Sequence, residues 1–448
     1  MPKADQLDHS SRWLHRLARA GFRLLSGSNP SPSWQDWIEA DNLLLRKEPS
    51  PPPAGPVVVD HYIGGLYCGG AERQLCNLAV AWKQRGQRVR VWTSWPPEGD
   101  LGHYRDLLVD GGVPVRAAGR EASSERSSPL LLQTPETVQG LVAALCSELV
   151  QDRPDLLHCW MDHANIIGGL AGLLAGVPRI LLSFRAANPT HFPRFHQPHM
   201  LPWYRLLLRS HRIDLLANSR PAAASYAAWL GWPVDRIHVV GNGLRLDHFA
   251  APTALQRAAA RQALGLTEED RVVVGLLRLH EEKQPELFLD VVRRAAQRIS
   301  GLRVLLAGVG PLEERVRSII ERERLDFVRL LGRWPEPGQL LAAADVLLLT
   351  SAQESCPNAV IEAQALGVPV VATRAGGMDE ALLDGRSGFL AGIRDAEQLA
   401  DYLVLLLEDR GLRRRLGAAG RQFAVETFNL DRMVRSMTQV YGQMLNAA

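Results

Sequence analysis

The chain has 448 residues, too many for one compact hydrophobic core, and this length favours two or three domains of ordinary size. Apolar residues make up 46% and charged residues 22%, a composition that argues against extensive disorder. The formal net charge of +3 excludes a strongly basic nucleic-acid binder, so we expect no nucleic-acid partner.

The cysteines and the apolar runs indicate a cellular compartment. Five cysteines are scattered without any Cys-x-x-Cys spacing, which indicates free thiols in a reducing compartment. The sequence has no run of about 18 apolar residues, so it predicts no transmembrane helix, and the N-terminus lacks the apolar core of a signal peptide. We therefore expect a cytoplasmic protein.

Residues 1–55 form an N-terminal extension that is amphipathic and basic and ends in a proline-rich stretch. Apolar residues alternate with arginines between positions 12 and 24, a pattern that fits an anionic membrane surface. A helix packed on its own domain, or a frayed tail, fits the same pattern. In the first case the protein would be peripheral on the inner face of the cytoplasmic membrane.

Residues 56–250 are expected to form the first domain. Short β-branched runs alternate there with amphipathic stretches, and strands followed by helices indicate a parallel sheet covered on both faces. The expected strands are 57–63, 89–94, 155–160, 179–184, 214–219 and 237–243, and the clearest helices are 69–86 and 164–176.

The same pattern restarts in residues 251–428, which predicts a second doubly wound domain and therefore an α/β protein with two parallel sheets. A last helix at 429–448 follows without a further strand, and we expect it to cross back to the first domain. The expected strands of the second domain are 272–279, 303–310, 328–333, 345–351 and 368–374, with helices at 285–299 and 311–325.

A glycine-rich turn, "GGLYCGGAERQ" at 64–74, joins the first strand to a helix expected to begin near Ala71. Glycines let the backbone approach a ligand closely, and a helix start offers N–H groups to an anion. The run has neither Gly-x-Gly-x-x-Gly nor the Gly-Lys-Ser/Thr of a P-loop, which disfavours a redox dinucleotide. An ordinary tight turn is the alternative.

Two cations lie at the end of the first strand of the second domain and in the turn after it, within "VGLLRLHEEKQPE" at 274–286. Arg278 and Lys283 lie across the strand end and the next turn, where they can neutralise a diphosphate without a metal. Taken alone, a pair of solvated surface side chains is the alternative.

The stretch "ESCPNAVIE" at 354–362 places two carboxylates at the two ends of one motif. Glu354 is expected in a loop and Glu362 inside the helix that follows, too far apart to share a proton. Separate roles at the two ends of one elongated ligand follow from that distance. Apolar neighbours predict little solvent around Glu362. A capping carboxylate and a helix-surface charge are the structural alternative.

The helix between these carboxylates is expected to follow a buried strand that ends at Ser351. Ser355 or Cys356 would cap the helix, with Pro357 in its first turn. Backbone N–H groups at the positive end of the helix dipole would hold phosphate oxygens. The expected donors are the N–H groups of Cys356, Asn358 and Ala359.

Together these motifs resemble the family-4 retaining glycosyltransferases of the GT-B fold, the glycosyl transferases group 1. The Glu-x7-Glu spacing, "GLLRLHEEK", "LLAGVGPLEE" and "TRAGGMDEALLDGRSGFL" are similar to family motifs of the second domain, and "GGAERQ" to the acceptor-side loop of the first. The resemblance spans about residues 57–430. It implies two Rossmann-like domains that face across an interdomain cleft.

The resemblance implies roles for residues of the second domain. Arg278 and Lys283 would bind the donor diphosphate and stabilise it as the leaving group. Glu362 would hold the ribose hydroxyls, while Glu354 and the amides near Asn358 would hold the donor sugar.

Further roles around the donor also follow from the resemblance. Gly308, Gly310 and Arg333 would lie around the nucleotide base. From the first domain, Gly70 would approach the phosphates and His163 would lie near the sugar.

Two departures from the family pattern fall on the acceptor side. Trp160 stands where many members have a second histidine after His158, and Arg185 stands where a Thr-x-His run is frequent. Asn165 and Arg185 are the acceptor-side candidates. These departures leave the acceptor open more than the chemistry.

The expected reaction is transfer of a sugar from a nucleotide-diphosphate sugar to a hydroxyl of a glycan or lipid-linked acceptor, with retention of configuration. No Asp-x-Asp or metal-ligand spacing is found, so we expect no metal and no cofactor. Bacterial surface polysaccharide or glycolipid assembly is the expectation at family level. A sugar-nucleotide epimerase, a phosphorylase and a non-catalytic sugar-nucleotide binding protein are the alternatives on this fold.

A stretch at 191–212 mixes aromatic residues with arginines. Basic aromatic surfaces favour anionic interfaces, so this stretch would contact lipid head groups or a lipid-linked acceptor. An amphipathic helix that covers the sheet is the alternative.

Overall fold

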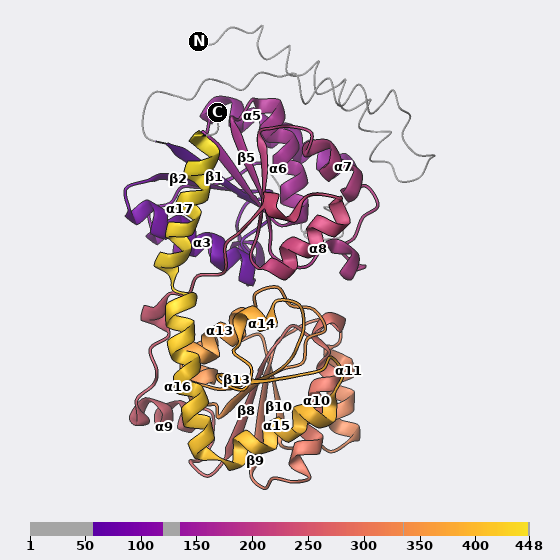
Figure 1. Ribbon diagram of the computed structural model, residues 1–448, viewed down its shortest axis with the longest axis vertical. Helices are drawn as coiled ribbons and strands as arrows, with labels where there is room; N and C mark the ends of the chain where they lie inside the picture. The colour runs from indigo at the N-terminus through magenta and orange to yellow at the C-terminus, as the bar shows by residue number, and fades with distance from the viewer. Residues whose placement is uncertain (1–56, 120–134, 335, 447–448) are drawn as a thin grey trace, which may run out of the picture. The chain divides into compact units, whose positions relative to one another are not determined.

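A computed structural model describes residues 57–119, 135–334 and 336–446, which fall into two compact units (Figure 1). Unit 1 contains the chain up to Asn218, residues 223–240 and the segment from Val434 onward. Unit 2 contains residues 219–222 and 241–433. The N-terminal extension predicted at 1–55, with its membrane pattern, lies outside the described residues.

Unit 1 is built on a seven-stranded sheet with the order β3-β2-β1-β4-β5-β6-β7, and every pairing in it is parallel. The order reverses between β1 and β4, the place where open α/β sheets bind ligands. The strands are β1 Val58–Ile63, β2 Arg88–Thr93, β3 Val115–Ala117, β4 Leu156–Trp160, β5 Arg179–Phe184, β6 Ile213–Ala217 and β7 Ile237–Val239.

Helices cover both faces of this sheet, and all residues of β1, β4 and β5 are buried. Close approach of α6 to β4 requires a glycine, since a Cβ at Gly168 would lie 2.3 Å from the Cys159 sulfur. The helices are α3 Gly70–Gln84, α4 Arg105–Asp110, α5 Pro135–Asp152, α6 Asp162–Ala175, α7 Met200–Leu207 and α8 Arg220–Leu230.

Unit 2 has a six-stranded sheet with the order β10-β9-β8-β11-β12-β13, again with parallel pairings throughout. Its order reverses between β8 and β11. The parallel sheets predicted from the sequence are thus confirmed. The strands are β8 Arg271–Leu276, β9 Leu302–Ala307, β10 Val328–Gly332, β11 Val346–Leu349, β12 Val370–Thr373 and β13 Gly388–Ala391.

The helices of unit 2 pack on one extended apolar core of buried valine and leucine side chains from the strands. They are α9 Ala254–Ala263, α10 Pro285–Ala296, α11 Glu313–Arg322, α12 Pro337–Ala343, α13 Asn358–Ala365, α14 Met378–Ala381, α15 Ala396–Glu408 and α16 Arg410–Thr427. The last helix, α17 Leu430–Asn446, begins in unit 2, and from Val434 onward its residues belong to unit 1.

The division between the units differs from the predicted boundary at 250. Residues 241–250 belong to unit 2, because Asn242 and Leu244 make their contacts there. The Asn242 amide donates to the Cys356 carbonyl at 2.9 Å and to Asn358 Oδ1 at 2.7 Å. Leu244 forms an isolated parallel bridge with Asn429.

The basic aromatic stretch at 191–212 folds back onto its own sheet. Trp203 and Tyr204 of α7 are 2% and 0% exposed, and Arg212 is 2% exposed. The Arg212 guanidinium donates to the carbonyls of Val177 and Leu173. These three side chains are unavailable to lipid, so the alternative of a helix covering the sheet is confirmed for them. None of the described helices combines the length and apolarity needed to cross a membrane.

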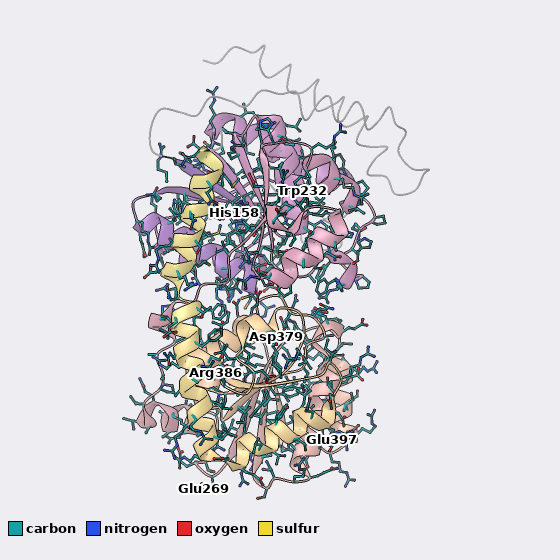
Figure 2. All side chains as sticks on the ribbon, viewed as in Figure 1. His158, Trp232, Glu269, Asp379, Arg386 and Glu397 are labelled. Atoms are coloured by element: carbon teal, nitrogen blue, oxygen red, sulfur yellow. The ribbon has the colours of Figure 1, made fainter. Side chains whose placement is uncertain are left out.

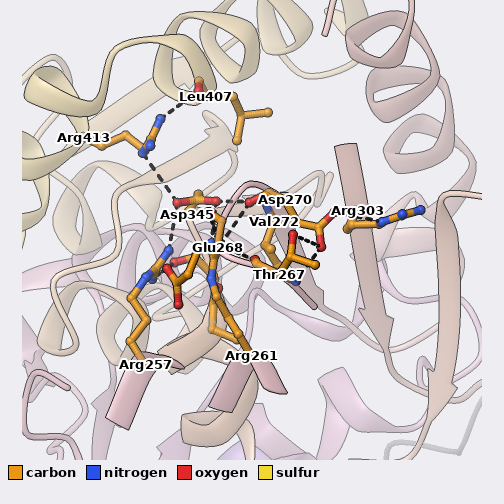
Figure 3. A network of polar contacts seen from close by, with 12 residues as sticks. Arg257, Arg261, Thr267, Glu268, Asp270, Val272, Arg303, Asp345, Leu407 and Arg413 are labelled. Atoms are coloured by element: carbon orange, nitrogen blue, oxygen red, sulfur yellow. Dashed lines mark hydrogen bonds and ion pairs between the residues drawn. The ribbon is translucent and has the colours of Figure 1, made fainter. Parts of the chain in front are cut away.

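A buried ionic network joins the strands of unit 2 to two helices (Figure 3). Asp345, just before β11, accepts from Arg261 at 2.9 Å and from the Val272 amide of β8 at 2.8 Å. Its other oxygen accepts from Arg257 at 2.9 Å and lies 3.6 Å from the Arg413 guanidinium of α16. One carboxylate therefore connects α9, β8, β11 and α16.

Candidate functional site

Two loops meet at the carboxyl edge of the unit 2 sheet. One loop follows β8 and carries a short 3₁₀ turn at Glu281–Lys283; the other follows β11 and leads into α13. Because β8 and β11 are paired neighbours and parallel, both loops leave the same edge of the sheet. This is the position at which α/β sheets hold their ligands.

An ion pair links these loops. Lys283 Nζ lies 2.6 Å from Glu354 Oε1, and the two side chains are 15% and 9% exposed. The Ser351 hydroxyl donates to the same carboxylate oxygen, also at 2.6 Å. Lys283 and Glu354 are both site residues predicted from the sequence, and the structure brings them into direct contact. The contact of Ser351 with Glu354 was not predicted.

Arg278 occupies the same loop as Lys283 and remains largely solvent-accessible. Its guanidinium lies 3.3 Å from Glu282 Oε1, with 58% of the arginine side chain exposed. The Glu282 carbonyl in turn accepts from the Ala352 amide at 2.8 Å, which joins the two loops through their backbones. The edge thus combines one partly buried cation with one exposed cation.

The helix after Glu354 starts later than predicted. Pro357, not Ser355 or Cys356, is the N-cap of α13, its backbone is extended, and no side-chain hydrogen bond caps the helix. Extended geometry is favoured at a residue that precedes a helix and is compatible with the fixed φ of proline. Glu354 lies in the loop, as predicted, and Asn358 and Ala359 are the first two residues of the helix.

Glu362 lies within α13 and is 2% exposed, which confirms the limited solvent predicted for it. A carboxylate buried in a helix needs polar or charged surroundings, because desolvation of a charge is costly. Its burial excludes the alternative of a solvated charge on the helix surface.

Glycines let a neighbouring loop pack directly on the strand end that precedes Arg278. Gly308 has φ +152°, and a Cβ there would lie 1.8 Å from the Leu277 carbonyl oxygen. A Cβ at Gly310 would lie 2.3 Å from the Leu279 carbonyl oxygen. Arg333, the remaining residue predicted around the base, follows β10 and is exposed.

Two further glycines contact the Glu354 loop and were quoted in the sequence only as part of a motif. The Gly377 amide donates to the Glu354 carbonyl at 3.0 Å. A Cβ at Gly376, where φ is +51°, would lie 2.0 Å from that carbonyl oxygen. The pair of glycines in "TRAGGMDE" is the signal for this close approach.

In unit 1, His163 is the second residue of α6, directly after the strained residue Met161 and Asp162. Met161 has φ 71° and ψ 159°, a region occupied almost only by glycine and often found at functional sites. Burial, with His199 nearby, lowers the His163 pKa to about 4. Among the described residues, His163 Nε2 is a buried atom without a hydrogen-bond partner.

The other predicted residues of unit 1 differ in accessibility. Gly70 is exposed at the first position of α3. Arg185 follows β5 and lies over the Trp160 ring, 4.9 Å from its centroid. Asn165 is 0% exposed, and its amide binds the Ser183 backbone and the Tyr204 hydroxyl. These bonds anchor the start of α6 to β5 and α7, and contact of Asn165 with an acceptor stays a prediction.

A buried aromatic cluster in unit 1 was not predicted. His61 and His158 face each other across β1 and β4, and the Trp160 indole N–H donates to His61 Nδ1 at 3.1 Å. His158 Nδ1 lies 2.7 Å from the Tyr441 hydroxyl of α17; Figure 2 labels His158. The contact joins positions 283 apart in the chain, so no local pattern indicates it.

The free energy of unfolding should decrease as the pH is lowered, because of these two histidines. Burial lowers the pKa of His61 from 6.5 to about 3 and that of His158 well below 6.5. In the unfolded chain both imidazoles bind protons below pH 6.5, while the folded ones stay neutral. The free energy of unfolding is therefore unaffected above that pH and falls below it by about 1.4 kcal/mol per pH unit for each histidine.

Urea unfolding at pH 7.0, 6.0 and about 5.5, followed by tryptophan fluorescence, tests this pH dependence. Averaged between pH 7.0 and 5.5, the slope of the free energy of unfolding against pH should be shallower for His158→Gln than for the wild type by about 0.8 kcal/mol per pH unit, because the full slope is reached only well below pH 6.5. An identical slope would show that His158 does not stay neutral in the folded protein.

The described side chains also bear on metal binding and on disulfide formation. Within residues 57–119, 135–334 and 336–446, no three His, Cys, Asp or Glu side chains come together so as to hold a metal ion. None of the five cysteines forms a disulfide, in agreement with the predicted thiols.

Two family models match consecutive parts of the chain. The model described as "Glycosyl transferases group 1" matches residues 256–423, and that described as "Glycosyltransferase Family 4" matches residues 68–248. The first match covers the Lys283 and Glu354 loops, and the second covers the Gly70 and His163 positions.

Curated relatives extend over most of the chain. The Vi polysaccharide biosynthesis protein VipC/TviE of Salmonella typhi is 28% identical over 403 residues, which are 83% of this chain and 69% of that protein. The D-inositol 3-phosphate glycosyltransferase of Corynebacterium diphtheriae is 33% identical over 403 residues, 85% of this chain and 91% of that protein.

Solved structures share the fold. Anabaena Alr3699/HepE, crystallised in complex with UDP and glucose, superposes with a TM-score of 0.72 at 22% identity. The match covers 86% of this chain and 99% of that chain. With the two parallel sheets described above, these matches confirm the GT-B fold predicted from the sequence.

Proposed function

Since the chain belongs to the glycosyl transferases group 1, glycosyltransferases of the GT-B fold, we propose that it moves a sugar from a nucleotide-diphosphate sugar to a hydroxyl acceptor with retention of anomeric configuration. The observation that carries this proposal is the Lys283–Glu354 ion pair beside Arg278 at the carboxyl edge of the unit 2 sheet.

Lys283 and Arg278 are proposed to stabilise the leaving diphosphate. Cleavage of the bond between sugar and phosphate leaves negative charge on the diphosphate and positive charge at the anomeric carbon. Cations at the phosphate therefore stabilise the transition state more than the ground state. Lys283 is the better placed of the two for this role, because its 15% exposure limits screening by water.

The acidic residues are proposed to orient the rest of the donor. Glu354 would accept hydrogen bonds from sugar hydroxyls, and Glu362 would accept them from the ribose. The amides at the start of α13, near Cys356, Asn358 and Ala359, would bind phosphate oxygens at the positive end of the helix dipole. Gly308, Gly310 and Arg333 would enclose the base.

For retention, the acceptor hydroxyl is proposed to attack from the face that the diphosphate leaves, and the diphosphate takes its proton. The two cations supply the positive charge, so the proposal requires no divalent metal ion. We expect transfer to persist at an unchanged rate in excess EDTA, and NMR of the product to show the anomeric configuration of the donor. An inverted product would refute retention, and loss of activity restored by Mg²⁺ would refute metal independence.

Within unit 1, His163 is proposed to contact the sugar and Gly70 the phosphates, with Arg185 on the acceptor side. A His163 pKa of about 4 keeps the imidazole neutral near pH 7. A neutral ring both donates and accepts hydrogen bonds, which suits contact with sugar hydroxyls.

The biological setting is proposed from the relatives. The Salmonella typhi relative is named for Vi polysaccharide biosynthesis, and another, LpsE of Rhizobium meliloti, for lipopolysaccharide core biosynthesis. We accordingly propose a glycan or lipid-linked acceptor in polysaccharide or glycolipid assembly, in the cytoplasm or at the inner face of its membrane.

A panel of donors tests the proposed function. Purified full-length protein is incubated with UDP-glucose, UDP-galactose, UDP-N-acetylglucosamine, GDP-mannose and ADP-glucose, and release of the nucleoside diphosphate is measured. Release from one of them is the expected result. Conversion of the sugar without diphosphate release would indicate an epimerase, and binding without any reaction a binding protein.

A further inference from the structure

We infer that Thr350 and Ser351, adjacent residues after β11, are positioning residues for two different parts of the donor. Ser351 orients Glu354 toward the sugar, and Thr350 holds the loop that carries Lys283 at the diphosphate. The inference rests on the proposed function for the identity of the donor, and it adds two residues that make no direct contact with the donor.

Ser351 fixes one oxygen of Glu354 and leaves the other available. Its hydroxyl and the Lys283 ammonium both donate to Oε1, each at 2.6 Å. Among the described residues, Oε2 accepts no hydrogen bond. Ser351 is itself held in place, since it is 0% exposed and its carbonyl accepts from the Thr373 hydroxyl of β12. The carboxylate is thus clamped through Oε1, and Oε2 is the acceptor left for sugar hydroxyls.

Thr350 acts on the backbone of the other loop. Its hydroxyl lies 3.2 Å from the carbonyl oxygens of both Lys283 and Gln284 and donates to them. Gln284 has φ 48° and ψ 56°, a left-handed conformation that costs energy for a residue with a side chain. The Thr350 hydroxyl therefore supports the strained turn that sets the direction of the lysine.

The two residues act on different groups, so their effects are separable by ligand. Removing the Ser351 hydroxyl loosens Glu354 and leaves the Lys283 loop supported. Removing the Thr350 hydroxyl loosens Lys283 and leaves the serine bond to Glu354. A nucleoside diphosphate, which lacks the sugar, should respond to the second change only.

Isothermal titration calorimetry of the full-length protein tests this separation. The probes are the nucleotide sugar that is turned over fastest in the donor panel and its own nucleoside diphosphate, for example UDP-glucose and UDP. Ser351→Ala should bind the nucleotide sugar about tenfold more weakly, the scale of one hydrogen bond to a charged group, with diphosphate affinity unchanged. Thr350→Val should bind both probes about tenfold more weakly.

Two further variants serve as controls. Thr350→Ser keeps the hydroxyl and should bind both probes as the wild type does. Ser387→Ala removes another fully buried serine hydroxyl, at the opposite edge of the sheet, and should change neither affinity; among the described residues it bonds only the backbone of Leu383. A general loss of packing would weaken all four variants alike, and circular dichroism reports their folding.

The outcomes separate this inference from the proposed function. Equal loss of both probes in Ser351→Ala, or no loss in either variant, would overturn the positioning roles while leaving the reaction intact. Failure of wild-type protein to release diphosphate from any panel donor would instead overturn the proposed function.

Discussion

Replacing Lys283 with alanine is expected to lower kcat for sugar transfer by about 10² to 10³-fold, the cost of removing one preorganised charge from a developing anion. Two effects act together. The leaving diphosphate loses its partly buried cation, and Glu354, 9% exposed, loses its counter-ion. An unpaired carboxylate would then repel the incoming phosphates. Steady-state kinetics at saturating donor measure the loss.

Charge, not side-chain length, should decide the result for Lys283. Lys283→Arg is expected to retain more activity than Lys283→Met, because arginine keeps the positive charge and binds phosphate oxygens. Arg298→Ala is the matched control: this surface cation pairs with Asp401, and its side chain is 45% exposed. Transfer by Lys283→Ala within about threefold of the Arg298→Ala rate would remove Lys283 from the mechanism.

Replacing Asp345 with alanine is expected to lower the free energy of unfolding by about 3 to 5 kcal/mol, the cost of breaking a buried ion pair from one side. The reason is the buried Arg261, which is 2% exposed and donates to Asp345 Oδ2. Without the carboxylate, Arg261 keeps only carbonyl partners, and the Val272 amide loses its acceptor.

Urea unfolding of unit 2 measures this loss, with Asp401→Ala as the matched control. Asp401 also pairs with an arginine, but its side chain is 53% exposed, so its removal should cost less than about 1 kcal/mol. Similar unfolding midpoints for the two variants would contradict the stabilising role given to the buried network.

Alternation of apolar runs and helical periodicity was enough to predict the fold. Strands such as 57–63 and 179–184 are largely apolar, a pattern typical of parallel sheets covered on both faces, and the structure confirms both strands as buried. The weakest patterns were missed. β3 spans only Val115–Ala117, and β13, Gly388–Ala391, follows a glycine-rich turn.

The candidate site was predictable where a side chain and its spacing carry the chemistry. Lys283 and Glu354 stand out in the sequence because each lies in a loop after an expected strand, within a motif that resembles a family motif. The predicted start of α13 was wrong. Pro357 adopts the N-cap conformation without a side-chain acceptor, so the helix does not use Ser355 as its cap.

Long-range contacts could not be predicted from local patterns. Tyr441 contacts His158 because the fold brings α17 to β4. Residues 241–250 belong to unit 2 through contacts such as the two hydrogen bonds of the Asn242 amide. The sequence predicted Ser351 only as the end of a strand. Its hydrogen bond to Glu354 could not be predicted, because it depends on the conformation of the loop between the two residues.

The proposed mechanism requires that Lys283 and its loop recognise a diphosphate. Its most direct test is the ratio of affinities for UDP and UMP, or for GDP and GMP if the panel favours guanosine, in wild-type and Lys283→Ala protein. We expect the wild type to prefer the diphosphate by about tenfold or more, and this preference to fall close to unity in the variant. A wild-type preference preserved in Lys283→Ala would contradict it.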